Sequence, residues 1–166
     1  MAAKNCYWPG DDSVLPLAVT LIKEFEACAA KPYLDIAGIA TIGYGTTAYP
    51  NGCHVSLQDA MISEVQACAY LEAKIATIAQ HFATMLLRRM PTAHQAAAML
   101  SLAYNIGLTA FASSNVLKQF NAGEVGFAAN SFSMWDKAHV DGRLVVVQGL
   151  DNRRERERKF FLTPDA

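Results

Sequence analysis

Apolar side chains recur at helical spacing near the start of the chain. Leu15, Val19 and Ile22 step by four and three residues, which is the period of one helix face, and Ser13 is a suitable N-cap before them. The next step of four reaches Glu26, so we expect this carboxyl to project from the buried stripe. Partial burial favours the protonated form of a carboxyl, which is the form that can donate a proton.

The pattern then changes to short β-like segments around Gly38. Residues 33–35 lead into this glycine and residues 39–42 lead out of it, which predicts a hairpin. With an odd-numbered loop centred on Gly38, at positive φ, Asp35 and Thr41 would be direct cross-strand neighbours. A two-residue loop would put them on opposite faces. We expect the odd loop, because it brings a carboxyl and a hydroxyl together.

The remainder of the chain shows helical patterns with clear boundaries. Ser56-Leu-Gln-Asp59 resembles a capping box and predicts an alanine-rich helix that runs to about Phe82. Thr92 with Gln95 three residues later opens another helix, which stops at Gly107. The last helix is expected from about residue 151 to residue 161.

These elements predict an α+β, mostly α, two-lobed fold in a single domain over residues 1–166. An irregular N-terminal arm covers residues 1–12. A small lobe with the β-hairpin is expected at about residues 13–58, and a larger all-helical lobe at about residues 59–166. The cleft between the lobes is the expected site.

Charge and hydropathy restrict the partners. The net charge of -1 gives no case for nucleic acid or for a membrane surface. The apolar run over residues 14–22 is too short for a membrane span, and no secretion signal is apparent. The charge is uneven, because residues 153–159 hold five basic and two acidic side chains. This run is interpreted as a solvated helix face, with two alternatives: binding of anionic wall polymer or outer-membrane lipid, or an arginine that reaches back to the site.

Cysteines and histidines show no ligand pattern. The four cysteines form no CxxC pair, and the four histidines are scattered (Cys6, Cys28, Cys53, Cys68; His54, His81, His94, His139). We therefore expect no metal and no cofactor. Four reduced thiols are expected, with a disulfide formed after export as the alternative.

Glu26, Asp35 and Thr41 form the constellation that indicates chemistry. Hydrolysis of a glycosidic bond needs one carboxyl that donates a proton to the leaving oxygen and another that is ionised and acts on water or on the sugar. Each residue also has a plain structural alternative: a surface carboxylate at a helix end, a turn cap and an ordinary strand threonine. Their combination favours a catalytic site.

Residues 22–47 resemble the catalytic segment of the phage-type lysozymes, the endolysins of glycoside hydrolase family 24. That family shows an aliphatic helix ending in Glu-Gly, then Tyr-x-Asp, a glycine turn and Thr-Ile-Gly-x-Gly. The spacing from Glu26 to Asp35 to Thr41 agrees without a gap. Further similar segments lie at 104–107, 111–114, 121–123, 135 and 149–157. The chain departs from the pattern at Ala27, where the family has glycine, and at Ala29, where it has arginine.

The resemblance implies a role for each site residue. Glu26 would be the general acid, and Asp35 with Thr41 would position and activate the attacking water. The bond cleaved would be the β-1,4 bond between N-acetylmuramic acid and N-acetylglucosamine in peptidoglycan, as in a lysozyme-type glycoside hydrolase (EC 3.2.1.17). Further implied residues are substrate contacts at Tyr44, Thr47, Tyr104, Asn105 and Ser114, and an orienting contact from Arg153 to Glu26.

The resemblance also implies a setting. The protein would be a monomeric phage or prophage endolysin, without stable membrane insertion, that waits in the host cytoplasm until a holin releases it. Two alternatives remain open. A lytic transglycosylase needs only one catalytic acid, and Asp35 with Thr41 argues against it. A non-catalytic wall-binding or antimicrobial protein is disfavoured because all three catalytic side chains are retained.

Overall fold

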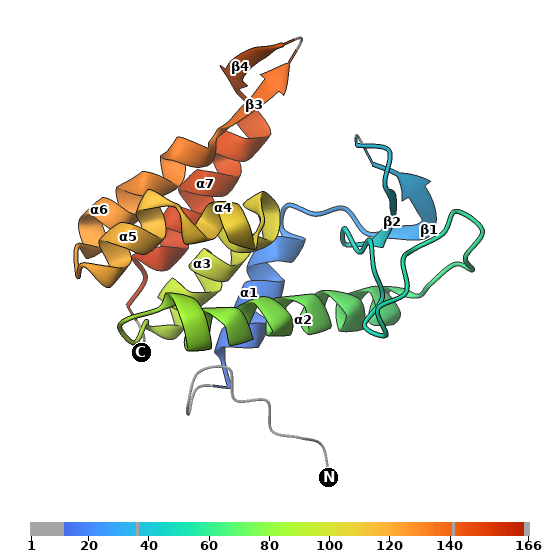
Figure 1. Ribbon diagram of the computed structural model, residues 1–166, viewed down its shortest axis with the longest axis horizontal. Coiled ribbons are helices and arrows are strands. Elements are labelled where there is room, and N and C mark those ends of the chain that lie inside the picture. Colours follow the sequence, from blue (N-terminus) through green and yellow to red (C-terminus); the bar gives the residue numbers. More distant parts are fainter. Residues whose placement is uncertain (1–11, 36, 141, 165–166) are drawn as a thin grey trace.

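The computed structural model describes residues 12–35, 37–140 and 142–164. Figure 1 shows β1 and β2 with the loop that follows them on one side, the other helices on the opposite side, and α2 extending between the two. The expected mostly helical α+β fold with a small hairpin lobe is confirmed. The elements in order are α1 (Val14–Lys23), β1 (Ala29–Leu34), β2 (Ala40–Gly43), α2 (Glu64–His81), the π-helical η1 (Phe82–Leu86), α3 (Ala93–Ile106), α4 (Leu108–Ala112), α5 (Asn115–Asn121), α6 (Val125–Asn130), the 3-10 helix η2 (Ser131–Trp135), β3 (Lys137–Val140), β4 (Arg143–Val146) and α7 (Gln148–Phe161).

Helix α1 begins after Ser13, as expected, and ends at Lys23. The backbone N–H groups of Phe25 and Glu26 both donate to the carbonyl of Ile22, at 3.0 and 3.1 Å, and this turn closes the helix. The expectation that Glu26 lies on the stripe of the helix is therefore wrong. The carboxyl is carried by the turn just after α1, and this position frees it from the helix face.

The β1–β2 hairpin has an odd loop, but its register differs from the expected one. Thr41 pairs with Tyr33, and the Asp35 N–H donates to the Ile39 carbonyl at 3.0 Å. The loop is therefore centred one residue before Gly38, whose φ is +75°. Direct pairing of Asp35 with Thr41 is wrong. Because the loop is still odd, the two side chains share one face as diagonal neighbours.

Helix α2 begins seven positions later than expected. Its capping box is formed by Ser63 and Gln66, since the Gln66 N–H donates to Ser63 Oγ at 3.2 Å and the Ser63 N–H to Gln66 Oε1 at 2.9 Å. The Ser56–Asp59 segment is an isolated turn. The Asp59 carboxylate accepts the Ser56 N–H at 2.8 Å and the Tyr49 hydroxyl at 2.7 Å, which ties this turn to the preceding loop instead.

Helix α3 is the centre of the helical lobe. Thr92 and Gln95 form the expected capping box, and the helix ends at Gly107, whose φ is +88°. Every residue from 96 to 103 is buried, because α1, α2 and α7 pack around it (Figure 1). Among the described helices, none is both long enough and apolar enough to cross a membrane.

The expected all-helical second lobe also contains a hairpin, so that expectation is wrong. Strands β3 and β4 are antiparallel, and Val140 pairs with Arg143. Both strands lie mostly in solvent, so their sequence lacks the apolar alternation that would reveal them. The Val147 N–H donates to the Asp136 carbonyl at 2.9 Å and closes the hairpin base, and α7 starts at Gln148, three residues earlier than expected.

Candidate active site

The last helix holds the carboxyl that follows the first helix. Arg153 of α7 is buried, and its Nη1 lies 2.6 Å from Glu26 Oε1. The side chain of Glu26 is 26% exposed, so one oxygen is held while the carboxyl still reaches solvent. The Arg153 guanidinium is fixed from behind by Glu157 Oε1, 3.2 Å from Nε, and by the Ser101 carbonyl, 3.4 Å from Nη2. The chain thus fixes the direction of this carboxyl through residues distant in sequence.

Glu157 is the centre of this buried network. Its Oε1 accepts the Ser101 hydroxyl at 2.6 Å and Arg154 Nη2 at 2.8 Å. Arg154 Nε also lies 2.7 Å from Glu157 Oε2, close enough for an ion pair but misaligned for a hydrogen bond. Burial raises the pKa of the Glu157 carboxyl, while Arg154 and Arg153 lower it. The negative charge of Glu157 also offsets part of the positive field that Arg153 exerts on Glu26.

The basic run on α7 is therefore divided between two faces. The solvated-face interpretation is wrong for Arg153, Arg154 and Glu157, which are all buried. The solvated-face interpretation does hold for Glu155, which pairs with Arg158 at 3.6 Å and Lys159 at 3.4 Å. Of the two alternatives, the arginine that reaches back to the site is observed as a contact.

Asp35 has a structural function in its own turn. Its Oδ1 accepts the N–H groups of Ala37 at 2.8 Å and Ile39 at 2.9 Å. Within the described part of the chain, both of its hydrogen bonds use this one oxygen. The turn therefore fixes the direction of the carboxylate while Oδ2 is left for another partner. Thr41 is buried on the same strand face, and its hydroxyl donates to the Ile39 carbonyl at 3.0 Å.

Tyr104 connects the helical lobe to β2. Its hydroxyl, at the end of a half-buried side chain on α3, donates to the carbonyl of Tyr44. Burial raises the pKa of Tyr104 well above its usual value, the negative charge of Glu26 adds to the increase, and Arg153 opposes it. The phenol is thus close enough to sense both members of the Glu26–Arg153 pair. A substrate contact from Tyr104 stays a prediction.

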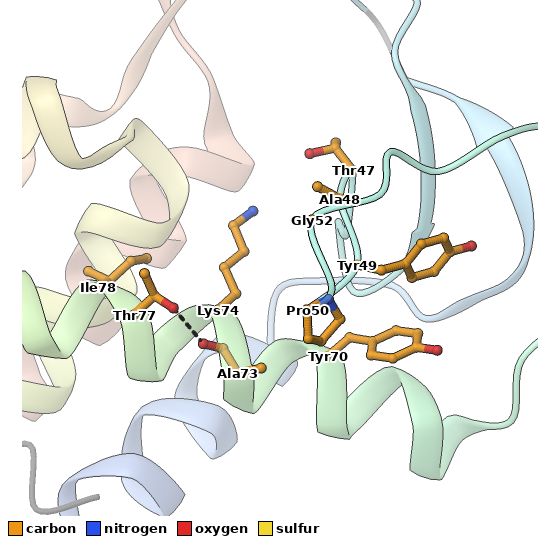
Figure 2. A pocket seen from close by; sticks show the side chains of 10 residues that line it. All are labelled: Thr47, Ala48, Tyr49, Pro50, Gly52, Tyr70, Ala73, Lys74, Thr77 and Ile78. Atoms are coloured by element: carbon orange, nitrogen blue, oxygen red, sulfur yellow. Dashed lines mark hydrogen bonds between the residues drawn. The ribbon is translucent and has the colours of Figure 1, made fainter.

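The other expected substrate contacts separate into two groups. Thr47 lines a cavity of about 410 Å³ between its own loop and α2 (Figure 2). Tyr44 is buried and donates to Glu64 Oε1 at 2.9 Å, so a sugar contact from its ring does not fit this placement. Asn105 accepts Arg154 Nη1 at 2.9 Å, and Ser114 is the buried N-cap of α5. The latter three residues have structural partners.

Sequence analysis missed two parts of the site. Lys74, on α2, projects into the cavity that Thr47 lines (Figure 2), and a single lysine in an alanine-rich helix gave no signal. The burial of Glu157 was also missed. Its spacing of three and four residues from Arg154 and Arg153 was visible, but the same spacing occurs in solvated pairs.

Metal ligands and disulfides are not observed among the described residues. There, His, Cys, Asp and Glu nowhere gather in a group of three that could hold a metal ion. Cys28, Cys53 and Cys68 carry free thiols, and Cys6 lies outside the described residues.

Replacing Arg153 with alanine is expected to lower stability by about 2–4 kcal/mol, because Glu157 loses one of its two cations. Activity should fall roughly 10- to 100-fold, because Glu26 loses its orientation. The pH dependence of activity is a further readout, because a merely structural role for Arg153 would leave it in place. Urea unfolding and rates of wall lysis across pH measure these changes.

Arg158→Ala is the matched control, because this arginine lies on the outer face of α7 and, within the described part of the chain, pairs with Glu155 and Asn130 near solvent. It should leave activity and pH profile unchanged. If Arg153→Ala lowers activity but leaves the pH profile in place, Arg153 is only a structural brace. If neither changes, the orienting role belongs to Arg154 or to no arginine.

Comparisons with known proteins agree on one family. The family model described as phage lysozyme matches residues 23–157. An endolysin of Acyrthosiphon pisum secondary endosymbiont phage 1 is 36% identical over 144 residues, which are 86% of this chain and 93% of that protein. The solved endolysin from Escherichia coli O157:H7 phage FAHEc1 is 34% identical with a TM-score of 0.79, over 88% of this chain and 90% of that one. The muramidase domain of SpmX from Asticaccaulis excentricus is 31% identical with a TM-score of 0.78, over 89% of this chain and 95% of that one.

Proposed function

The chain belongs to the phage lysozyme family, and from this premise we propose the bond that it cleaves and the role of each residue at its site. The protein is an endolysin-type lysozyme, a glycoside hydrolase whose substrate is peptidoglycan. The proposed bond is the β-1,4 linkage between N-acetylmuramic acid and N-acetylglucosamine. The observation that carries this proposal is the partly exposed Glu26 carboxyl held by the buried Arg153.

Glu26 is proposed as the general acid. Arg153 occupies Oε1, so Oε2 is the oxygen that would carry the proton to the leaving glycosidic oxygen. Glu157, on the far side of Arg153, holds the guanidinium in place. These two buried contacts of Arg153 support a fixed orientation of the Glu26 carboxyl.

Asp35 and Thr41 are proposed to hold the attacking water. The Asp35 carboxylate is fixed through Oδ1 by its turn, which leaves Oδ2 to accept a proton from water. Thr41 lies on the same face of the hairpin, and its hydroxyl oxygen, which donates its own hydrogen to the Ile39 carbonyl, would accept the second hydrogen of the water. Direct attack by water on the side opposite the leaving group inverts the anomeric carbon. A lytic transglycosylase would not need this second group.

The biological setting follows from the family resemblance alone. We propose that the chain acts as a monomer during host cell lysis. We also propose that it waits in the host cytoplasm and reaches the wall after a holin perforates the membrane. Fractionation of infected cells before lysis, with and without the holin, measures where the protein resides.

Product analysis tests the proposed reaction. Purified protein is incubated with Gram-negative sacculi, and the released muropeptides are separated and weighed by mass spectrometry. Hydrolysis gives reducing N-acetylmuramic acid ends that each carry one added water. Products lighter by one water, with 1,6-anhydro ends, would replace this proposal with transglycosylation. Sacculi that remain intact, while permeabilised cells still bind the protein, would indicate a wall-binding module.

Asp35→Asn separates the turn-capping function of this residue from its proposed catalytic one. Asparagine keeps an acceptor oxygen for the two backbone N–H groups, so the hairpin should stay folded. It cannot take a proton from water, so the rate of wall hydrolysis should fall about 10²–10⁴-fold. Hydrolysis rates and the urea midpoint measure both effects.

The matched control is Asp59→Asn, because Asp59 also caps a turn by accepting the Ser56 N–H. Its activity should stay near that of the parent protein. If Asp35→Asn is partly unfolded and its activity falls only in proportion to the folded fraction, Asp35 serves the turn alone.

A further inference from the structure

Lys74 is a cation inside the proposed substrate cavity, and the proposed reaction leaves it without a role. Its side chain projects from α2 toward the space above the loop that carries Thr47 (Figure 2). The ammonium Nζ lies 4.5 Å from the ring centroid of Tyr104 and 3.4 Å from the Gly45 carbonyl oxygen. These contacts come from both lobes, and they hold the ammonium at the mouth of the cavity.

The ammonium of Lys74 has only weak partners among the described residues. Crowding by protein atoms lowers the pKa of Lys74, although the residue keeps solvent-exposed surface, and the charge of Glu26 opposes this effect. Among the described residues, no carboxylate lies within ion-pair distance of Nζ. The carbonyl of Gly45 is a long, weak partner, and the ring of Tyr104 is a weak one. An arriving anion would therefore gain more here than at a fully hydrated lysine.

The surroundings of Lys74 suit a polar, carbohydrate-like ligand. Four side chains that line the cavity of about 410 Å³ carry hydroxyl groups: Thr47, Tyr49, Tyr70 and Thr77. Small and apolar residues line the remainder, beside Lys74. Thr77 donates its hydroxyl to the Ala73 carbonyl (Figure 2), and the same oxygen can still accept a hydrogen bond. Tyr104 lies beside Lys74, and the charge of Glu26 acts on the pKa of both residues.

We propose that Lys74 is a specificity-determining residue that binds a carboxylate on the side arm of the muramic acid unit. This proposal rests on the proposed function and names the part of the substrate that it recognises. The carboxylate has two possible sources with the same chemistry. Muramic acid carries a lactyl carboxyl, which is free where no peptide is attached, and stem peptides carry carboxylates of their own.

The test compares the parent protein with Lys74→Gln and Lys74→Arg on three soluble glycan strands. One strand keeps its stem peptides, one has lost them to an amidase and exposes lactyl carboxylates, and one has all carboxyls converted to neutral amides. On carboxylate-bearing strands, Lys74→Gln should raise KM about tenfold, the loss of one hydrogen bond to a charged group, with kcat little changed. Lys74→Arg should keep most of the affinity. Lys159→Gln removes one lysine charge from the outer face of α7 and is the matched control.

The three strands also distinguish the sources of the carboxylate. An effect on the peptide-bearing strand alone assigns the stem peptide, whereas an effect that persists after amidase treatment assigns the lactyl group. On the amidated strand, the parent protein should itself show the raised KM of Lys74→Gln. This arm needs no variant, so the proposal stays testable if Lys74→Gln does not fold.

Two results would overturn the proposal. An equal loss for Lys74→Gln on all three strands, or a loss in kcat with a shifted pH profile, would mean that Lys74 acts on Glu26 or on the structure. An unchanged KM of the parent protein on the amidated strand would mean that no substrate carboxylate is bound. If the parent protein cleaves none of the strands, the proposed function fails and not this inference.

Discussion

Glu26→Gln is expected to lower the rate of peptidoglycan hydrolysis about 10²–10⁴-fold while the fold stays intact. Glutamine keeps the shape of the side chain and an oxygen that can accept Arg153 Nη1, so the link between the first turn and α7 survives. It cannot donate the proton that the leaving oxygen needs. Turbidity reduction with permeabilised Gram-negative cells measures the rate, and circular dichroism with urea unfolding measures the fold.

Glu24→Gln is a closely matched control for this variant. Glu24 lies two residues earlier and forms a surface ion pair with Arg156, with both guanidinium contacts at 2.8 Å. Its loss should cost about 0–1 kcal/mol of stability and none of the activity. A Glu26→Gln protein that cleared peptidoglycan at the parent rate would exclude Glu26 as the acid and remove the basis of the proposed mechanism.

Glu157→Gln is expected to lower the free energy of unfolding by about 3–5 kcal/mol, because two arginines would then lack their shared buried counter-charge. In thermal unfolding this corresponds to a loss of roughly 6–20 °C in Tm for a chain of this size. Activity should also fall at temperatures where the variant is folded, since the contact that aims Arg153 at Glu26 is weakened when its acceptor loses the negative charge. Urea unfolding with a constant m-value, together with lysis rates, checks both parts.

Two further variants separate charge from shape in this network. Glu155→Gln, on the same helix, removes a carboxylate that is exposed and pairs only with solvated cations, so its stability should change by less than about 1 kcal/mol. Adding Arg154→Leu to Glu157→Leu should recover part of the stability that Glu157→Leu loses alone, because one uncompensated cation is removed. A Glu157→Gln protein as stable as the parent would show that the buried charges are balanced without Glu157.

The two lobes are connected through the same region that carries the proposed chemistry. The Tyr104 hydroxyl bonds the Tyr44 carbonyl, and Lys74 contacts both the Tyr104 ring and the Gly45 carbonyl. These ties join α2 and α3 to the segment after β2. Movements of one lobe relative to the other would therefore change the cavity beside Lys74.

Local patterns in the sequence were sufficient to predict α1, α3 and the presence of the first hairpin. The steps of four and three residues before Lys23 and the capping box of Thr92 with Gln95 depend on neighbours within one turn, so no distant contact is needed to interpret them. The odd loop of the β1–β2 hairpin also follows from local turn chemistry. Asp35 and Thr41 therefore share a face even though their predicted pairing was wrong.

The sequence by itself also determined the family, since Glu26, Asp35 and Thr41 at their spacing were enough to recognise it. The sequence did not determine the exact bounds of several helices, or which charged side chains are buried. The end of α1 before Glu26 and the turn at Ser56 depend on hydrogen bonds that compete with helix continuation. Packing of the surrounding protein decides whether such a segment continues as a helix or forms a turn.

Only the tertiary structure decided the electrostatics of the site. The family resemblance singled out Arg153, but the charge pattern of the last helix does not distinguish it from Arg158. Arg153 is buried against Glu26 and Arg158 faces solvent, because α3 covers a single face of α7. Lys74 is likewise an ordinary helix lysine until the loop after β2 closes over it. The cost of burying a charge and the strength of its pairing both depend on the surrounding protein, which is assembled from segments far apart in the chain.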